Sequence, residues 1–303
     1  MTNNPHTPTT PEVIDYEGST YRTDFWEGKG RDYEDAVERA ALRRLLPAAA
    51  RRYVDFGGGF GRLINEADRY EQVVVLDYSS TMLKDAQARL GRSPRYTYVN
   101  ADLYRLPFMP NTFDAGLLCR VIHHLADAPA ALKQIRSTFA PGGVFVLEFA
   151  NKLNLKAMLR YALRLQKWSP YDRQPVEFVK LNFDFHPAYI QEALRAAGFS
   201  PRRRLAVSWL RLGVFKRALP LSAMVALDKA LQPLGGLLPL APSLFVENFT
   251  AGQPVALTPS ESMFKCPITG AALHREGDTL VSVPGGPRWA IRDGIYDFKT
   301  PLE

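Results

Sequence analysis

An aspartate followed by closely spaced glycines is the segment of this chain with the most specific chemistry. Asp55 stands two residues before Gly57, and Gly58, Gly59 and Gly61 follow. Glycines let the backbone turn tightly and approach a ligand, and such a turn usually opens a helix whose N-terminal amides favour negative charge. That indicates a nucleotide, although glycine-rich turns also occur with no ligand. Because the carboxylate repels a pyrophosphate but can accept hydrogen bonds from an ammonium, the spacing favours a cationic, phosphate-free adenosine ligand.

Two further aspartates follow the next two apolar runs of the sequence. Asp77 closes one run, where its carboxylate can accept both hydroxyls of a ribose. Asp102 follows the other and can accept from the exocyclic amine of an adenine, with Tyr78 and Leu103 offering apolar contact to the ring faces. Any one of these aspartates alone is more typical of a helix cap or a turn. Together, at nucleotide-binding spacing, they indicate a nucleotide site.

The elements that must position these residues are three short strands. The apolar runs 53–56, 73–76 and 96–99 read as buried strands, and each ends beside one of the aspartates. A strand, a glycine turn and a second strand ending in a carboxylate is the order found in a βαβ nucleotide-binding unit.

At this point the sequence resembles the class I S-adenosylmethionine-dependent methyltransferases, in particular the subgroup with the ubiquinone and menaquinone biosynthesis enzymes. The similarity runs from about residue 50 to 150, and its motifs are Val-Asp-Phe-Gly-Gly-Gly-Phe-Gly (54–61), Leu-Asp-Tyr-Ser (76–79), Ala-Asp-Leu (101–103), Leu-Pro-Phe (106–108), Asn-Thr-Phe-Asp (111–114), Val-Ile-His-His-Leu (121–125) and Phe-Ala-Pro-Gly-Gly (139–143). The resemblance implies an α/β fold: a doubly wound, mostly parallel seven-stranded sheet with helices on both faces.

The same resemblance implies a role for each matched residue. Asp55 and the glycines would face the methionine part of S-adenosylmethionine, Asp77 the ribose and Asp102 the adenine. Cys119 lies at the end of the fourth strand, where family members contact the cofactor.

Composition is consistent with a large α/β domain and a smaller unit. The 303 residues are 46% hydrophobic, enough to bury a sizeable core. With two cysteines, Cys119 and Cys266, the chain cannot form a four-cysteine zinc site, and we expect no metal. Residues 1–12 do not resemble a signal peptide and no apolar stretch reaches the roughly 20 residues that span a bilayer. These features predict a cytoplasmic protein, soluble or peripheral.

The chain divides into four parts. We expect residues 1–20 to be disordered, and residues 21–250 to form the methyltransferase domain, with an insertion at 151–182. Residues 21–50 carry aromatic side chains and then a helical pattern. In similar enzymes this region is a lid over the site, but it can equally be an aromatic cluster that packs a helix onto the sheet. Residues 251–303 follow turn and linker signals and form a distinct tail.

The insertion carries the main indication of the substrate. A helical pattern over 153–168 places Lys156, Arg160, Arg164 and Lys167 in one stripe beside a broad apolar face. Such a helix can lie on an anionic membrane, or pack on the core with a solvated cationic edge. A second apolar region, 219–244, is interrupted by proline and glycine and reads as short helices around a hydrophobic pocket. Together they predict a small lipophilic methyl acceptor.

Two histidines follow the fourth strand, on the acceptor side of the resembling enzymes. His124 is the candidate catalytic base, because a neutral imidazole can take a proton from an attacking nucleophile. Many methyl transfers need little acid–base help beyond alignment. His123 and His124 can equally cap a helix or shape the pocket, and His186 before Pro187 reads as a helix cap.

The tail resembles the small zinc-ribbon-like activator family of methyltransferases. The match is Ala-Ile-Arg-Asp-Gly-Ile at 290–295, and Cys266 stands at the first cysteine position. Thr269 occupies the second ligand position and no cysteine follows, so the metal pattern is absent. We expect a fused, metal-free unit that docks on the edge of the sheet and is held by packing of Phe264, Ile268, Trp289, Ile295 and Phe298.

Formal charge is +7, so two other functions remain open. An RNA or protein methyltransferase could use the basic residues Arg202 to Arg204, Arg211, Lys216 and Arg217. Nucleic acid is the weaker prediction because no RNA-binding module is recognisable and the insertion is rich in leucine. The second alternative is a non-catalytic scaffold that keeps the cofactor fold, against which the complete aspartate set argues. Neither the acceptor atom nor the oligomeric state follows from the sequence.

Overall fold

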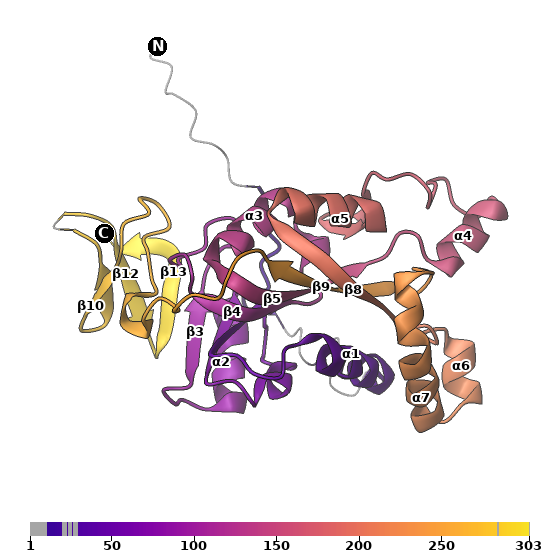
Figure 1. Cartoon of the computed structure of the whole chain (residues 1–303), viewed down its shortest axis with the longest axis horizontal. Helices are drawn as coiled ribbons and strands as arrows, with labels where there is room; N and C mark the ends of the chain where they lie inside the picture. The colour runs from indigo at the N-terminus through magenta and orange to yellow at the C-terminus, as the bar shows by residue number, and fades with distance from the viewer. Residues whose placement is uncertain (1–10, 20–22, 24–25, 27–29, 284, 303) are drawn as a thin grey trace, which may run out of the picture.

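A central parallel sheet forms the body of the molecule (Figure 1). The computed structural model describes residues 11–19, 23, 26, 30–283 and 285–302. Seven strands lie in the order β3-β2-β1-β4-β5-β9-β8, and β9 is antiparallel to both of its neighbours while the first five are parallel. Their bounds are β1 Arg52–Phe56, β2 Gln72–Asp77, β3 Tyr96–Asn100, β4 Phe113–Leu118, β5 Phe139–Ala150, β8 Phe199–Val207 and β9 Ser243–Thr250. The predicted α/β sheet is confirmed.

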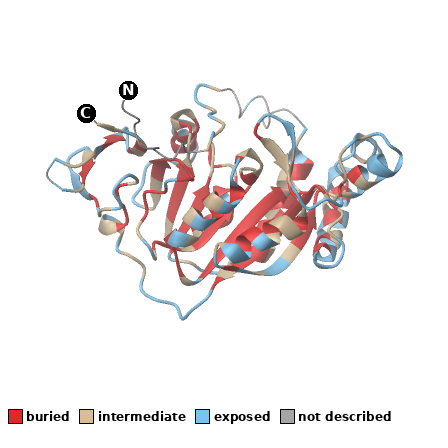
Figure 2. Cartoon of the chain, turned by 90° about the horizontal axis from the view of Figure 1, so that it is seen from above, coloured by how far each residue is buried: buried red, intermediate tan, exposed pale blue. Residues whose placement is uncertain are grey.

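Helices cover both faces of this sheet, because alternate side chains of each strand point to opposite sides. Val54 and Phe56 of β1 pack on the side of α3 (Ala128–Thr138) and α5 (Pro187–Ala196). Tyr53 packs on the other side, with α1 (Asp32–Leu45), α2 (Ser80–Leu90) and α7 (Leu221–Leu231). Figure 2 shows the buried sheet between these layers. His186 caps α5 as predicted, since its Nδ1 accepts from the Ala188 N–H at 3.1 Å.

Four C-terminal strands extend the sheet beyond β3. They are β10 His274–Glu276, β11 Thr279–Val281, β12 Arg288–Arg292 and β13 Ile295–Leu302, and β13 pairs in parallel with β3. The prediction that the tail docks on a sheet edge agrees with this pairing, and the whole sheet has eleven strands rather than seven. Within the described residues, no group of three histidine, cysteine or acidic side chains is placed to hold a metal ion.

Packing of the tail differs from the prediction at one residue. Phe264, Trp289, Ile295 and Phe298 are buried, whereas Ile268 is 57% exposed. Ile268 lies in the turn that follows Cys266, so it contributes no core contact of the kind predicted.

Phe264 joins the tail to the methyltransferase core, and its loss is expected to destabilise the protein. Its ring lies 5.7 Å from Phe108 in the core and 4.8 and 5.3 Å from Tyr296 and Phe298 in the tail. We expect Phe264→Ala to lower the free energy of unfolding by about 3–5 kcal/mol, because a large buried ring leaves a cavity. Ile268→Ala is the matched control and should change it by less than about 0.5 kcal/mol. Urea unfolding measures both; equal effects would contradict this packing.

The insertion between β5 and α5 is less helical than predicted. It contains α4 (Leu155–Ala162) and a hairpin of β6 (Val176–Val179) and β7 (Asn182–Asp184). The predicted helix over 153–168 ends at Ala162. Only Ala157 of α4 is buried, so little packing is available to prolong a short helix.

The second apolar region, 219–244, has the predicted short helices but differs from the prediction in its packing. It contains the short helix α7 and the single turn η4 (Gln232–Gly236), and α6 (Gly213–Ala218) directly precedes it. The other single turns of the described chain are η2 (Ile64–Ala67), η3 (Ile122–His124) and η5 (Ser260–Ser262). Instead of enclosing a pocket, many of its leucines face outwards, among them Leu221, Leu227, Leu237 and Leu238. The prediction of a hydrophobic pocket within 219–244 is therefore wrong.

Near the N-terminus, residues 11–19 are placed against the domain, so the prediction of disorder over 1–20 is wrong for them. Val13 forms a β-bridge with Leu125, and Glu17 accepts from the Ser80 N–H at the start of α2 at 2.7 Å. Residues 1–10 and 20 of that prediction, and residues 21–22, 24–25 and 27–29 of the region 21–50, lie outside the described residues.

Candidate functional site

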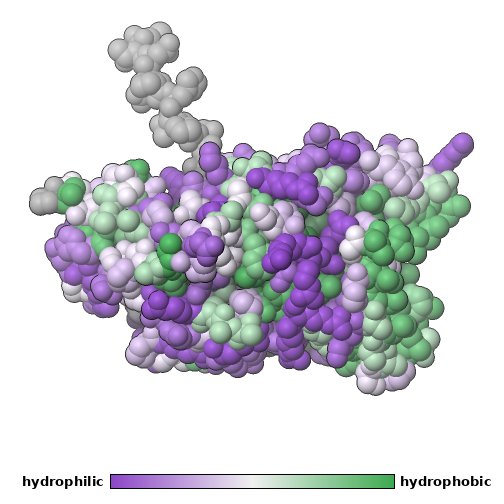
Figure 3. All heavy atoms as spheres, in the orientation of Figure 1, coloured by the Kyte–Doolittle hydropathy of each residue, from purple (hydrophilic) through white to green (hydrophobic). Residues whose placement is uncertain are grey.

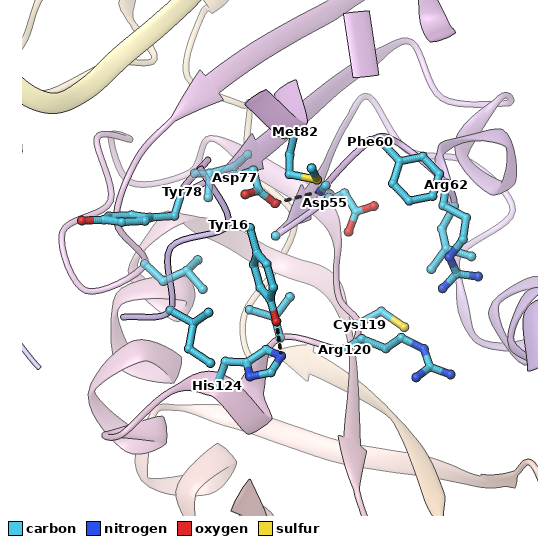
Figure 4. A pocket seen from close by; sticks show the side chains of 18 of the residues that line it. Tyr16, Asp55, Phe60, Arg62, Asp77, Tyr78, Met82, Cys119, Arg120 and His124 are labelled. Atoms are coloured by element: carbon cyan, nitrogen blue, oxygen red, sulfur yellow. Dashed lines mark hydrogen bonds between the residues drawn. The ribbon is translucent and has the colours of Figure 1, made fainter. Parts of the chain in front are cut away.

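The main cavity lies at the carboxyl ends of β1, β2 and β4, where parallel sheets of this kind bind ligands. Figure 4 shows the aspartates of two strands side by side in it, with Tyr78 towards one end and Arg62 towards the other. The predicted residues that line it are Asp55, Gly57, Gly58, Gly59, Asp77, Tyr78, Leu103, Cys119 and His124. Most of the other lining side chains are apolar.

Gly61 and Asp102 are not among the described residues that line this cavity. Gly61 lies behind the loop, where a Cβ would meet Leu90 at 2.8 Å. Asp102 lines a smaller neighbouring cavity that shares Tyr78 with the main one, and its Oδ1 accepts from the Tyr104 N–H at 2.8 Å. Its predicted contact with an adenine amine stays a prediction.

The glycine loop is held open by backbone geometry and by Asp77. Gly57 has φ of +69°, and a Cβ there would lie 2.3 Å from a Val121 methyl group, so any larger residue would clash. The Gly59 N–H donates to Asp77 Oδ2 and the Ser79 N–H to Oδ1, both at 2.9 Å. Asp77 therefore ties the loop after β1 to the start of α2.

Burial disfavours the ionised form of both strand-end aspartates. It raises the pKa of Asp55 to about 7, against the opposing effect of Arg62, with Asp77 adding to the rise. Burial likewise raises the pKa of Asp77 to about 6, although three backbone N–H groups oppose it. A buried carboxylate with few donors is stabilised by a cationic ligand. Burial raises the pKa of the Cys119 thiol, which therefore stays protonated and acts as an apolar wall.

His124 reaches the cavity from η3 with a defined tautomer. Its Nδ1 lies 3.1 Å from the Leu181 carbonyl oxygen, which can only accept, so Nδ1 carries the proton. Nε2 is then an acceptor, and the Tyr16 hydroxyl donates to it at 3.3 Å (Figure 4). Burial lowers the pKa of His124, so the imidazole is neutral near pH 7. His123 is partly buried and packs against it, with ring centroids 4.0 Å apart, and does not line the cavity among the described residues.

Leu181 holds this histidine through an unusual backbone conformation. Leu181 is buried with φ of +53°, in the turn between β6 and β7, and its N–H donates to Glu177 at 2.7 Å. A positive φ at a leucine costs free energy and persists where its surroundings require it. The insertion thus contributes directly to the site.

Two arginines at the opposite end of the cavity were missed in the sequence. Arg62 and Arg120 both line it and both form ion pairs with Glu38 of α1, which is fully buried. The Trp26 ring lies over the Arg62 guanidinium at 3.7 Å. Arg62 follows Gly61 directly, so its place next to the motif was an available signal. The ion pairs with Glu38 depend on how α1 packs against the sheet, so no local signal in the sequence could have predicted them.

A strap of residues 13–18 is the second missed feature. Val13, Ile14 and Tyr16 line the cavity, and Glu17 and Gly18 hold the strap to Ser80 and Thr81. Asp15 forms an ion pair with Lys299 of the tail at 2.9 Å. These contacts join segments far apart in the chain, and nothing in the local sequence pattern marks them.

Comparison with known proteins agrees with the fold and the pocket, which together define a methyltransferase of the Rossmann-like class. The methyltransferase domain family matches residues 54–147. The ubiquinone/menaquinone biosynthesis C-methyltransferase UbiE of Pseudomonas syringae pv. syringae is 30% identical over 54% of this chain and 69% of its own length. The UbiE of Haemophilus ducreyi is 35% identical over 33% of this chain, which spans only 39% of that relative.

The chain belongs to the class I S-adenosylmethionine-dependent methyltransferases. S-adenosylmethionine is accordingly its cofactor. One chain of the complex between the Haloferax volcanii Trm112 methyltransferase activator and a methyltransferase superposes with a TM-score of 0.51 at 17% identity, covering 73% of this chain and 92% of that one. That likeness concerns the fold alone.

Proposed function

We propose that this protein transfers the methyl group of S-adenosylmethionine to a small lipophilic acceptor, with His124 as the proton acceptor. The observation that carries the proposal is the fixed tautomer of His124, whose Nε2 faces an otherwise largely apolar cavity. Its UbiE relatives carry quinone C-methyltransferase names, which favours a quinone-like ring as the acceptor.

The cavity residues fit the cofactor by their chemistry. S-adenosylmethionine supplies an activated methyl group on a sulfonium. Asp55 would accept from the ammonium, and Asp77 would accept from the ribose hydroxyls while it keeps the glycine loop in place through the Gly59 N–H. The cofactor's carboxylate is next to its ammonium, and Arg62 and Arg120 in the cavity lining would attract it. Gly57 and Gly58 provide close backbone approach, and Tyr78 and Leu103 flank the base.

His124 would act on the acceptor from the other side of the cavity. A neutral imidazole whose Nε2 is an acceptor can take the proton of a ring hydroxyl or of the attacked carbon. Tyr16 now donates to that nitrogen, at the place where an acceptor hydroxyl would bind. The apolar strap residues Val13 and Ile14, with Val121 and Leu125 on either side of η3, would hold the rest of the ring.

Identification of the methylated product tests the proposal. The protein is incubated with labelled S-adenosylmethionine and, in parallel, with a lipid extract, total tRNA and a protein extract. We expect the label in a lipid, identified by mass spectrometry. Label in tRNA or protein would overturn the lipophilic acceptor in favour of the RNA or protein alternative. Cofactor binding without label transfer to any extract would favour the scaffold.

RNA remains the weaker candidate in the structure. The Arg203 side chain donates to the Arg44 carbonyl at 2.7 Å and Arg204 to the Gly235 carbonyl at 2.6 Å, so two of the predicted phosphate contacts are engaged within the protein. Lys216 forms an ion pair with Glu34 at 2.8 Å.

Cofactor affinity should depend on pH through Asp55. Its pKa is about 7 in the free protein, and only the carboxylate attracts an ammonium, so binding favours the ionised form. Affinity should therefore be flat above about pH 7 and fall by up to about ten-fold per unit below it. Calorimetry of S-adenosylmethionine binding at several pH values measures this. Asp55→Asn should bind weakly and lose the pH dependence between about pH 6.5 and 8, leaving only the fall through the pKa of Asp77 at about 6. An unchanged slope between about pH 6.5 and 8 in that variant would contradict the assignment.

A further inference from the structure

One end of the molecule exposes an unusual concentration of apolar side chains. Of the nineteen large hydrophobic residues exposed in the described part of the chain, sixteen lie between Leu155 and Leu238, and only Val255, Ile268 and Val283 lie elsewhere. Leu237 is 84% exposed and Leu163 68%. Figure 3 shows hydrophobic residues gathered at the end of the molecule where α4, α6 and α7 lie in Figure 1. Contiguous exposed apolar patches of this kind mark interaction surfaces.

These elements form one continuous surface, which we call the apolar end: α4 with residues 163–167, α6, α7 and residues 232–238. The Leu155 N–H at the start of α4 donates to the Leu240 carbonyl at 2.9 Å, and Asn151 Nδ2 donates to the Pro239 carbonyl at 2.6 Å. Leu238 in turn donates to the Leu234 carbonyl at 2.7 Å, and η4 directly follows α7. The apolar side chains are thus neighbours in space although they are distant in sequence.

The charge of the apolar end has a single sign. The acidic residue of these segments, Asp228, is buried and accepts from the Tyr33 hydroxyl at 2.5 Å. Six basic side chains of the apolar end make no ion pair with a described residue: Lys156, Arg160, Arg164, Lys167, Arg217 and Lys229. Exposed leucines interleaved with unpaired cations are the composition that binds the interface of an anionic bilayer.

We infer that the apolar end docks on the surface of an anionic lipid bilayer. Its leucines would enter the interface while lysine and arginine side chains reach the headgroups. A second copy of the chain is a poorer occupant, because pairing two such ends would bring unpaired cations of both copies together. The sequence predicted membrane contact through 153–168 alone. The structure enlarges that stretch to include α6, α7 and the leucines of 234–238.

Membrane docking rests on the proposed function, because a lipophilic acceptor resides in the bilayer. Vesicle binding can nevertheless be measured independently of methyl transfer. Flotation with vesicles of equal parts phosphatidylcholine and phosphatidylglycerol measures binding in the absence of cofactor and acceptor. We expect the protein to rise with these vesicles, to stay down with pure phosphatidylcholine, and to dissociate as salt is raised. No rise with the anionic vesicles would overturn the inference while leaving the methyltransferase proposal intact.

Matched variants distinguish binding through the apolar end from the effects of net charge and of exposed apolar residues elsewhere. Lys156→Glu/Arg160→Glu/Lys167→Glu should weaken binding by about a hundred-fold or more, because each of the three cations contributes roughly five-fold. Arg51→Glu/Lys84→Glu/Lys133→Glu changes the net charge equally at exposed sites elsewhere and should have little effect.

Leu159→Glu/Leu237→Glu tests the apolar contribution against Val255→Glu/Ile268→Glu, which are exposed outside the apolar end. Only the first pair should abolish flotation, with unchanged circular dichroism and S-adenosylmethionine binding in all variants. Equal losses in the control variants would contradict a specific surface. Sedimentation velocity tests whether the apolar end binds a second copy of the chain instead. If the wild type is a dimer that does not bind vesicles, and Leu159→Glu/Leu237→Glu is a monomer, the surface is a dimer interface.

Discussion

Replacing His124 by glutamine is expected to lower the rate of methyl transfer about 10²- to 10⁴-fold at saturating S-adenosylmethionine, the usual contribution of a general base. Glutamine can keep a polar group near Nε2 but cannot accept the proton. Cofactor affinity should change little, because the loop residues and the two strand-end aspartates are untouched. The measurement is the initial rate of label transfer into the lipid product, together with calorimetry of cofactor binding.

The pH profile distinguishes a base from a group that only positions the acceptor. Burial lowers the pKa of His124 below its ordinary value, so the neutral imidazole should persist below pH 6.5. The rate should therefore begin to fall only at a pH below 6.5. That fall should disappear in His124→Gln. Tyr16→Phe is the companion variant: it removes the hydroxyl that donates to Nε2 and should keep the wild-type rate or raise it. Full activity in His124→Gln would end the role of this residue as the base.

Replacing Asp77 by alanine is expected to weaken S-adenosylmethionine binding about 10²- to 10⁴-fold. Two hydrogen bonds from the ribose to a charged acceptor contribute about 1.5–3 kcal/mol each. The variant also frees the Gly59 and Ser79 N–H groups that this carboxylate now binds at 2.9 Å, so the glycine loop loses its anchor. Calorimetric titration with S-adenosylmethionine gives the dissociation constant.

Asp102→Ala is the informative comparison for that result. Asp102 lies outside the main cavity lining among the described residues, and its carboxylate already accepts from Tyr104. A single hydrogen bond from the adenine amine to this carboxylate contributes about 1.5–3 kcal/mol, so its loss should weaken binding about 10- to 10²-fold. If Asp102→Ala weakens binding more than Asp77→Ala, the ribose site is misassigned.

The sequence predicted the centre of this fold well because its signals are local. Buried parallel strands read as continuous apolar runs, as the valines of β2 do. Few residues other than glycine adopt a positive φ, so a glycine beside a strand end, such as Gly57, is a local signal for a tight turn. Asp55 and Asp77 could therefore be placed at one edge of the sheet from spacing alone.

The remaining parts of the site depend on contacts between distant segments. Tyr16 and His124 are 108 residues apart, and the strap that carries Tyr16 has no apolar periodicity. The Arg120 side chain reaches Glu38 only after α1 has packed against the sheet. The sequence after Ala162 has a helical pattern, but the helix ends there. The local helix propensity is present, whereas the tertiary packing that would stabilise a longer helix is not.

A crystal structure of the protein with S-adenosylhomocysteine would show directly whether this cavity holds the cofactor in the proposed orientation. We expect the ribose hydroxyls on Asp77, the ammonium on Asp55, and the sulfur turned towards Nε2 of His124, with the acceptor space between them. A ligand bound outside this cavity, or one whose sulfur faces Arg62 and Cys119 instead, would contradict this expectation.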